Sequence, residues 1–284
     1  MKTEPTSCLY KEVEMFFDLC KSLCTLCFCV KNSTQRMIFV FILVCFFSCT
    51  GKKTSSDTSG KSTVVVATSS WTAAYAWAAG AEKVVTLAPF EMAHPSEYEL
   101  RPSDIPNLLN AEMIIYAGYE IMTERLKKGL NIPLENLIQI ETDYNLESMH
   151  TSIMKIAAKL GTERIARDNL QDIRLIINEG RKALKEKGMS GQPVVVHRFQ
   201  SSVARELGLT PVLLFGSAAP EATEITAVSK TNASIIIDNF HNPVGQPFTE
   251  VLQGATYIQL LNFPGQKRTQ TLVDVIRYNI SQLL

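Results

Sequence analysis

The stretch ERIARDNLQDIRLIINEGRKALKEK at residues 163–187 sets the architecture of this chain. Its apolar residues recur at helical spacing, which predicts one helix about 37 Å long at a rise of 1.5 Å per residue. A helix of that length is too long for a crossover inside one small domain. The same spacing begins at Leu146, and the glycine and proline of residues 188–193 end it. We therefore predict a linking helix over residues 146–188.

Short strands alternate with helices on both sides of this linking helix. The predicted strands cover residues 63–68, 83–87, 113–116 and 137–140 before it, and 193–197, 212–215, 234–238 and 255–261 after it. Further helices are predicted over residues 71–79, 104–110, 202–207 and 272–284. Because this alternation is typical of parallel sheets covered by helices, we predict an α/β fold. Its two α/β lobes, at residues 63–145 and 189–284, are joined by one long backbone helix.

The first 62 residues have the composition of a leader followed by a tether. Residues 37–49 carry no charge and follow two basic residues, which is typical of a secretory signal and too short for a membrane span. The run ends at Ser48-Cys49, which resembles the lipidation motif of bacterial lipoproteins. Residues 50–62 are rich in Ser, Thr, Gly and Lys, as in flexible linkers. We expect a leader at residues 1–49, lipidation at Cys49, and export to the periplasm or cell exterior.

Charge and cysteine content exclude several classes of protein. Lys plus Arg and Asp plus Glu both number 28, and this balance argues against a nucleic-acid-binding protein. All 7 cysteines lie within residues 1–49, so the body has no disulfide, thiolate nucleophile or cysteine metal ligand. The chain has neither a Walker motif nor a Gly-x-Gly-x-x-Gly sequence, so nothing in it supports nucleotide binding.

Three of the four histidines follow predicted strands. His94 lies in the loop after one strand, His197 is the last residue of another, and His241 lies three residues beyond the strand that ends at Asp238. Loops at the carboxyl ends of parallel strands form the ligand crevice of open α/β sheets. Neutral imidazole is the commonest protein ligand for a metal ion. Each histidine taken singly also fits a hydrogen-bonded structural role, but three in equivalent places favour a metal site.

Residues 94–105, HPSEYELRPSDI, resemble the motif that follows the first metal-ligating histidine in a family of transport proteins. The family comprises the substrate-binding lipoproteins of zinc- and manganese-type metal ABC transporters, known as cluster A-I. Residues 111–118 (AEMIIYAG) and 197–209 (HRFQSSVARELGL) are similar to further family motifs. The resemblance covers residues 63–284 and includes the long linking helix.

The resemblance implies a ligand set, residue by residue. His94 matches the first family ligand and His197 the third. His241 is the best match to the fourth, with Asp238 as the alternative. The family's second ligand is a histidine in an Asp-Pro-His-x-Trp context that this chain lacks, and Glu141 aligns with it, with Asp143 beside it. Either a carboxylate substitutes for that histidine, or the site has three protein ligands, or the ion differs. Three imidazoles and one carboxylate suit zinc, whereas a second carboxylate favours manganese.

The function implied by the resemblance is transport rather than catalysis. We expect a monomeric, lipid-anchored solute-binding protein that captures a divalent metal ion between its lobes. The ion is zinc, alternatively manganese or iron, and is delivered to an ABC permease and its ATPase. One alternative keeps the fold but binds chelated iron, haem or a corrinoid. Another is a metal-dependent hydrolase with an open coordination position.

Overall fold

The computed structural model of the chain describes residues 64–129 and 132–284. The predicted leader (1–49), tether (50–62) and lipidated Cys49 lie outside the described residues. The described residues belong to one compact unit of the chain. None of the helices in this part of the chain is long and apolar enough to span a bilayer.

The first sheet consists of four parallel strands in the order β2-β1-β3-β4. The strands are β1 (Val65–Ala67), β2 (Val84–Thr86), β3 (Met113–Tyr116) and β4 (Leu137–Gln139). The helices of this half are α3 (Ser70–Ala78), α4 (Ile105–Leu109) and α5 (Thr123–Lys128), with 3-10 turns at Pro95–Glu97, Pro102–Asp104 and Leu134–Asn136. Every residue of β1 and β3 is buried, as expected for central strands covered on both faces.

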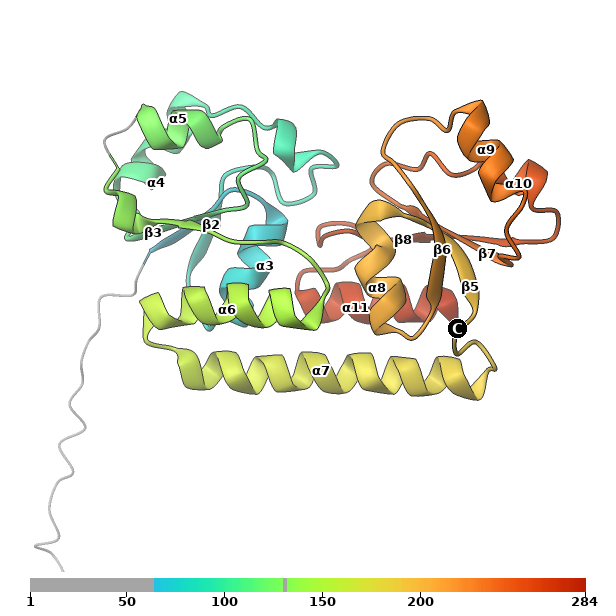
Figure 1. Ribbon diagram of the computed structural model, residues 1–284. Helices are drawn as coiled ribbons and strands as arrows, with labels where there is room; N and C mark the ends of the chain where they lie inside the picture. Colours follow the sequence, from blue (N-terminus) through green and yellow to red (C-terminus); the bar gives the residue numbers. More distant parts are fainter. Residues whose placement is uncertain (1–63, 130–131) are drawn as a thin grey trace, which may run out of the picture. The chain divides into compact units, whose positions relative to one another are not determined.

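The second sheet repeats this plan with the order β6-β5-β7-β8, again all parallel (Figure 1). The strands are β5 (Pro193–His197), β6 (Thr210–Phe215), β7 (Ile235–Asn239) and β8 (Thr256–Leu260). The helices are α8 (Ser201–Glu206), α9 (Ala222–Val228), α10 (Phe248–Val251) and α11 (Leu272–Leu283), with a 3-10 turn at Arg198–Gln200. The predicted α/β fold with two parallel sheets is confirmed, and α5, α9 and α10 are additions that the sequence patterns did not indicate.

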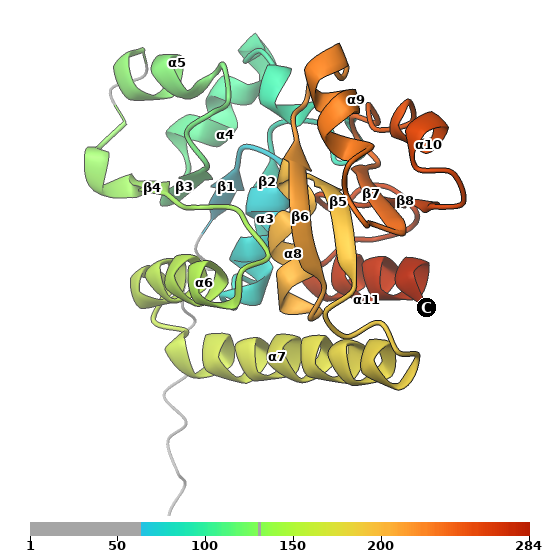
Figure 2. The same ribbon diagram turned by 45° about the vertical axis from the view of Figure 1, so that its right-hand side comes forward.

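The linking segment consists of two helices rather than the single helix predicted over residues 146–188. They are α6 (Leu146–Leu160) and α7 (Glu163–Glu186), and α7 confirms the long helix predicted over residues 163–187. The chain reverses at Gly161, whose φ of +71° lies in the left-handed region that glycine adopts without strain. Figures 1 and 2 show α7 running alongside α6 and α11. The apolar pattern continues across residue 161 because both helices face the same core.

The hydrophobic core is shared by the two halves. The largest buried cluster contains Val65 and Ile115 from the first sheet together with Val194 and Ile237 from the second. Two smaller clusters cover the other faces, one built around Ile114 in the first sheet and one around Ile236 in the second. The two sheets therefore share their largest core, and each has a smaller one of its own on its other face.

Candidate metal-binding site

His197 is the last residue of β5, and its side chain is fully buried. The ring accepts a hydrogen bond at Nδ1 from the Phe199 N–H at 3.2 Å. Its Nε2 is buried and has no hydrogen-bond partner within the described residues. Burial lowers the pKa of His197, and the nearby Asp238 carboxylate opposes this in part. The imidazole is therefore neutral at pH 7.

His241 lies two residues beyond β7, the strand that neighbours β5. Its ring accepts a hydrogen bond at Nδ1 from the Asn262 N–H at 3.3 Å and stacks on Phe263 with 3.8 Å between ring centroids. Its Nε2 is also buried without a partner in the described part of the chain. Burial, together with the charge of His94, lowers the pKa of His241 to about 4.

The two buried rings have the same protonation pattern. Because each Nδ1 accepts a backbone N–H, the proton of each neutral ring resides on Nε2. A metal ion bound at Nε2 requires that proton to move to Nδ1 and the backbone contact to be given up. These contacts, at 3.2 and 3.3 Å, lie at the long end of the range for N–H hydrogen bonds.

His94 is exposed and precedes the 3-10 turn Pro95–Glu97. Its charge contributes to the lowered pKa of His241, which places the two imidazoles within electrostatic range of each other. The loop that carries His94 is held by side chains of the same sequence motif. The Tyr98 hydroxyl donates to Asp104 Oδ2 at 2.9 Å, and the Arg101 N–H donates to the same oxygen at 2.8 Å. The motif therefore builds the loop as well as presenting the histidine.

Asp238 anchors the loop that carries His241. Its Oδ1 accepts the Asn239 N–H at 2.8 Å, and its Oδ2 accepts both the Gly245 N–H and the Tyr257 hydroxyl at 2.6 Å. These bonds join the two ends of loop 239–245 to β8. The three hydrogen bonds use three of the about four acceptor sites of a carboxylate, so Asp238 holds this loop and stays the alternative to His241 as a ligand.

Glu141 and Asp143 follow β4 but have different surroundings. The Glu141 side chain is exposed, and its carboxylate has no hydrogen bond or ion pair among the described residues. Asp143 is half-buried: its Oδ1 accepts the Tyr144 N–H at 2.7 Å and its Oδ2 accepts the Ser202 hydroxyl at 2.9 Å. The latter bond connects the two halves of the chain. Both carboxylates lie near Tyr75, whose pKa burial raises strongly.

The structure brings the predicted ligands together only in pairs. His94 interacts electrostatically with His241, and Asp238 interacts with His197. Within residues 64–129 and 132–284, no three His, Asp or Glu side chains are close enough to hold one metal ion. The complete set of His94, Glu141, His197 and His241 therefore stays a prediction.

Three further buried side chains have unpartnered polar atoms near the two buried histidines. Gln200 donates from Nε2 to the Leu260 carbonyl at 3.2 Å, and its Oε1 has no partner in the described chain. Asn262 Oδ1 and Trp71 Nε1 are likewise buried and unpartnered there. The strand-end reasoning that identified the histidines could also have found Gln200 and Asn262, because both follow strands of the second sheet.

The segment after β8 connects the two halves beside these side chains. The Ser70 hydroxyl donates to the Pro264 carbonyl at 2.7 Å, and Gln266 Nε2 donates to the Glu91 carbonyl at 2.8 Å. Gly265 passes so close to Phe90 that a Cβ at this position would lie 2.2 Å from the Phe90 carbonyl oxygen. The loop therefore has little freedom to move while these contacts persist.

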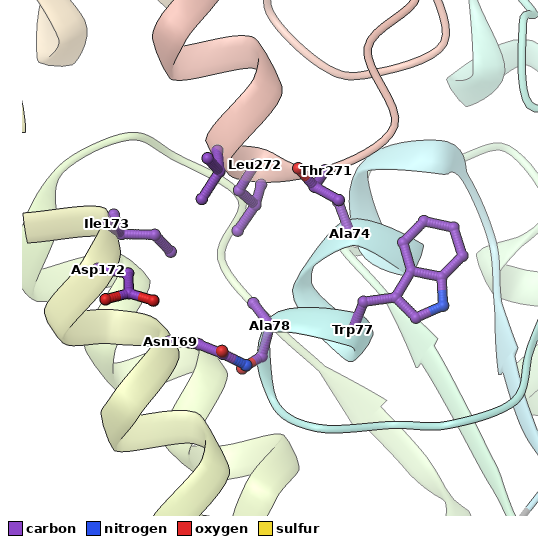
Figure 3. Close-up of a pocket in the computed structure, with 9 residues that line it drawn as sticks. Ala74, Trp77, Ala78, Asn169, Asp172, Ile173, Thr271 and Leu272 are labelled. Carbon is purple, nitrogen blue, oxygen red and sulfur yellow. The ribbon is translucent and has the colours of Figure 1, made fainter. Parts of the chain in front are cut away.

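A separate cavity of about 240 Å³ lies between α3, α7 and α11 (Figure 3). Trp77, Ala78, Asn169, Asp172 and Leu272 contribute to its lining. Asn169 is engaged there, because its Nδ2 donates to the Ala78 carbonyl at 3.0 Å. None of the predicted metal ligands lines this cavity, so it is not the predicted metal site.

Comparison with solved structures shows that the fold is shared with metal-binding solute-binding proteins. FpvC of Pseudomonas aeruginosa in complex with Ni²⁺ has a TM-score of 0.62 at 15% identity, over 78% of this chain and 94% of its own. A mutant of the periplasmic metal-binding protein of Candidatus Liberibacter asiaticus, in its Mn-bound form, has a TM-score of 0.58 at 16% identity, over 78% and 98%. The laminin-binding protein of Streptococcus agalactiae, described as an adhesin with metal-transporting activity, has a TM-score of 0.60 at 13% identity, over 78% and 100%.

Comparisons of sequence alone give no match, either to protein-family profiles or to curated proteins. At identities this low the structural similarity establishes the fold. The fold implied by the resemblance to cluster A-I receptors is therefore confirmed.

Proposed function

We propose that this chain is an extracytoplasmic solute-binding protein that captures a divalent metal ion and delivers it to an ABC permease. The observation that carries the proposal is the pair His197 and His241. They lie at the carboxyl ends of adjacent parallel strands, are at least nine-tenths buried, and have Nε2 atoms without a partner in the described residues. Buried polar atoms in native proteins are rarely left unpaired without a functional reason.

The electrostatics of the two rings favour cation binding at neutral pH. Burial lowers the pKa of both histidines, so each ring is uncharged and does not repel an incoming ion. Neutral imidazole is a good ligand for zinc and is also compatible with manganese or iron. His94, on the other half of the chain, is our candidate for a third imidazole. A shift of its loop toward His241 would close the site around the ion.

The solved structures of this fold support the assignment to metal capture, because FpvC is described in complex with Ni²⁺ and with Mn²⁺. We assign zinc as the first candidate ion and manganese as the second. Export, anchoring through Cys49, and docking on a permease with its ATPase are parts of the same proposal. We also propose that the chain acts as a monomer and is not an enzyme.

Titration of the metal-free full chain with Zn²⁺ and with Mn²⁺ tests the proposal. We expect one ion per chain with a Kd below about 1 μM, and a gain in unfolding free energy of about 2.7 kcal/mol at a free ion concentration of about 100 times the Kd. His197→Gln and His241→Gln should each weaken binding by at least tenfold. His150→Gln is the matched control, because His150 is exposed on α6. Absence of binding tighter than micromolar for both ions would contradict the proposal.

A further inference from the structure

The two buried histidines of the candidate site are closed off from solvent in the structure. His197 and His241 are 0% and 8% exposed, and the Nε2 atom of each ring is buried. An ion can therefore reach these atoms only after a covering segment has moved. Two contacts to the His241 ring come from residues just beyond β8. The Asn262 N–H donates to Nδ1 at 3.3 Å, and Phe263 stacks on the imidazole with 3.8 Å between centroids.

The covering segment continues as a strap, residues 262–268, that reaches from the second half of the chain to the first. The Pro264 carbonyl accepts a hydrogen bond from the Ser70 hydroxyl at 2.7 Å. Further along the strap, Gln266 Nε2 donates to the Glu91 carbonyl at 2.8 Å. Both bonds must break before the strap can lift away from the first half and carry Phe263 with it.

The same strap holds the loop that carries His94. Glu91, which accepts the bond from Gln266, lies three residues before His94 in the loop after β2. His94 is exposed and His241 is buried, and no three His, Asp or Glu side chains of the described residues are close enough to hold one ion. The His94 loop must therefore move before the predicted ligands can meet. Release of the strap would free that loop and uncover His241 in one step.

Two residues of the strap have an unfavourable backbone conformation. Lys267 and Arg268 have φ values of +52° and +61°, in the left-handed region that residues with a Cβ seldom adopt. Such a conformation persists only while the surrounding contacts hold it. These contacts include the Lys267 ammonium group 4.9 Å from the centre of the Phe240 ring and the Thr269 N–H bond to the Gln266 carbonyl at 3.0 Å. The strain favours release of the strap once its bonds to the first half are broken.

Building on the proposed function, we propose that the strap is a gate through which the ion enters and leaves the site. In the closed state, the two bonds to the first half keep Phe263 over His241 and hold the His94 loop. In the open state, the backbone of residues 267–268 leaves the left-handed region and the His241 ring meets solvent. The gate belongs to the metal-free chain, so its opening is measurable without any ion.

Reaction of the metal-free full chain with diethyl pyrocarbonate, which modifies exposed imidazoles, tests the gate when each histidine is followed by mass spectrometry. His150 is exposed on α6 and serves as the internal reference. We expect His241 to react at least about tenfold more slowly than His150, because it reacts only during local opening. Ser70→Ala removes one bond to the strap and should speed the reaction of His241 by about fivefold. Equal rates for His241 and His150 in the wild type would overturn the inference.

Thr162→Val is the matched control for Ser70→Ala. The Thr162 hydroxyl donates to the Ala79 carbonyl at 2.5 Å, so this variant also removes a hydroxyl–carbonyl bond, at the opposite end of α3 and away from the strap. The reaction rate of His241 should stay within about twofold of wild type. An equal acceleration in both variants would show a general loosening of the fold and would overturn the gate.

Arg268→Gly and Arg268→Ala test the part that backbone strain plays. Both remove the same side chain, but only glycine adopts a φ of +61° without strain. Arg268→Gly should therefore slow the reaction of His241 by about threefold or more relative to Arg268→Ala. Equal rates in the two variants would contradict the role of strain in opening. If Zn²⁺ does not bind the chain at all, the proposed function fails, while these reaction rates still decide whether the strap opens as a gate.

Discussion

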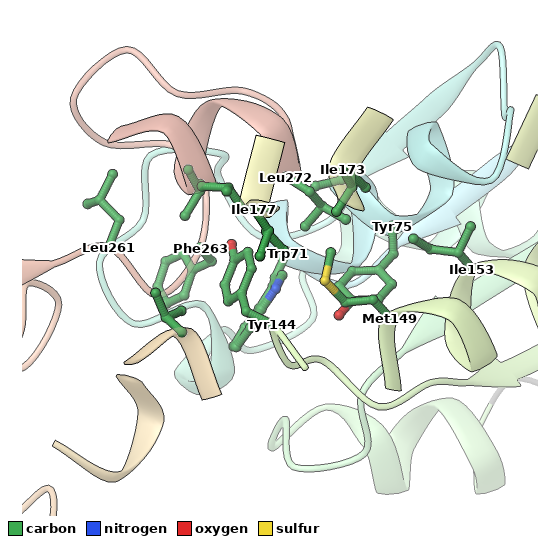
Figure 4. Close-up of a cluster of buried hydrophobic side chains, with 14 of the residues drawn as sticks. Trp71, Tyr75, Tyr144, Met149, Ile153, Ile173, Ile177, Leu261, Phe263 and Leu272 are labelled. Carbon is green, nitrogen blue, oxygen red and sulfur yellow. The ribbon is translucent and has the colours of Figure 1, made fainter. Parts of the chain in front are cut away.

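The ring of His241 stacks on the ring of Phe263 with 3.8 Å between centroids and 21° between planes. Phe263 in turn contacts Trp71, which stacks on Tyr144 with 5.9 Å between centroids. Figure 4 shows Trp71, Tyr144 and Phe263 within the shared core. A candidate ligand of the second half is thus supported by an aromatic column that begins in the first half. Loss of a ring from that column should alter both stability and ion binding.

Phe263→Ala should destabilise the chain by about 3–5 kcal/mol, because it removes a buried aromatic ring from a shared core. It should also weaken zinc binding by tenfold or more, since His241 loses the surface that orients it. Denaturant unfolding and zinc titration measure the two effects. Phe199→Ala is the control, because Phe199 is 49% exposed and should cost less than about 1 kcal/mol. Equal losses of unfolding free energy in both variants would contradict a stabilising role for the aromatic column.

The metal-free chain should lose stability as the pH falls from about 6.5 to about 4. The pKa of His241 is about 4 in the folded chain, below its ordinary value of 6.5, so the unfolded chain binds more protons in this interval. The stability that the neutral His241 contributes is therefore fully present above about pH 6.5. Acidification to below about pH 4 removes it and lowers the unfolding free energy by about 3 kcal/mol. Unfolding free energies of wild type and His241→Gln at about pH 7 and about pH 4.5 measure it. A pH dependence unchanged by the variant would show that His241 does not contribute.

Gly265→Ala should destabilise the contact between the two halves. The φ of Gly265 is +118°, and a Cβ would lie 2.2 Å from the Phe90 carbonyl oxygen, so the backbone must move. We expect a cost at least about 2 kcal/mol greater than that of Gly254→Ala. Gly254 is a matched control because it also has positive φ, at +83°, but an added Cβ there would meet no atom within 4 Å. Thermal unfolding of the two variants decides the comparison.

Asp238→Asn should cost about 1–3 kcal/mol in unfolding free energy, because the amide keeps one acceptor oxygen and its N–H₂ group must face either the Asn239 N–H or the Gly245 and Tyr257 donors. Tyr257→Phe removes only one of these bonds and should cost about 1 kcal/mol. If Asp238 were a metal ligand instead, Asp238→Asn would abolish zinc binding with little loss of stability. Parallel unfolding and titration experiments separate the two roles.

Tyr144→Phe should leave the chain as stable as wild type or up to about 1 kcal/mol more stable. The Tyr144 hydroxyl is buried without a hydrogen-bond partner in the described residues, so its removal relieves an unpaired polar group. The ring and its stacking on Trp71 are retained. Differential scanning calorimetry measures the change, and a loss above about 1 kcal/mol would indicate that the hydroxyl makes a bond with bound water.

Apolar periodicity and turn residues were enough to predict most elements of the fold. The predicted bounds of β3 and β5 agree with the structure, since both are short apolar runs with polar or glycine neighbours. The break at residue 161 fell inside the predicted linking helix, because the apolar spacing on its two sides is the same. The short helices α5, α9 and α10 were missed because segments of four to seven residues carry too few apolar positions for a period. The equally short α4 and α8 were predicted from the flanking Ser103 and Gly208.

The order of the residues alone predicts alternating strands and helices, a body of the chain without cysteine, and histidines that follow strands. These properties depend on neighbours along the chain. Only the folded structure showed that His197 and His241 are buried while His94 is exposed. It also showed that the Asp238 carboxylate accepts hydrogen bonds from Gly245 and Tyr257. Finally, it placed Trp71 beside Phe263, the residue that follows Asn262. The physical reason is that burial and the use of each lone pair depend on contacts between residues far apart in the sequence, which no local pattern records.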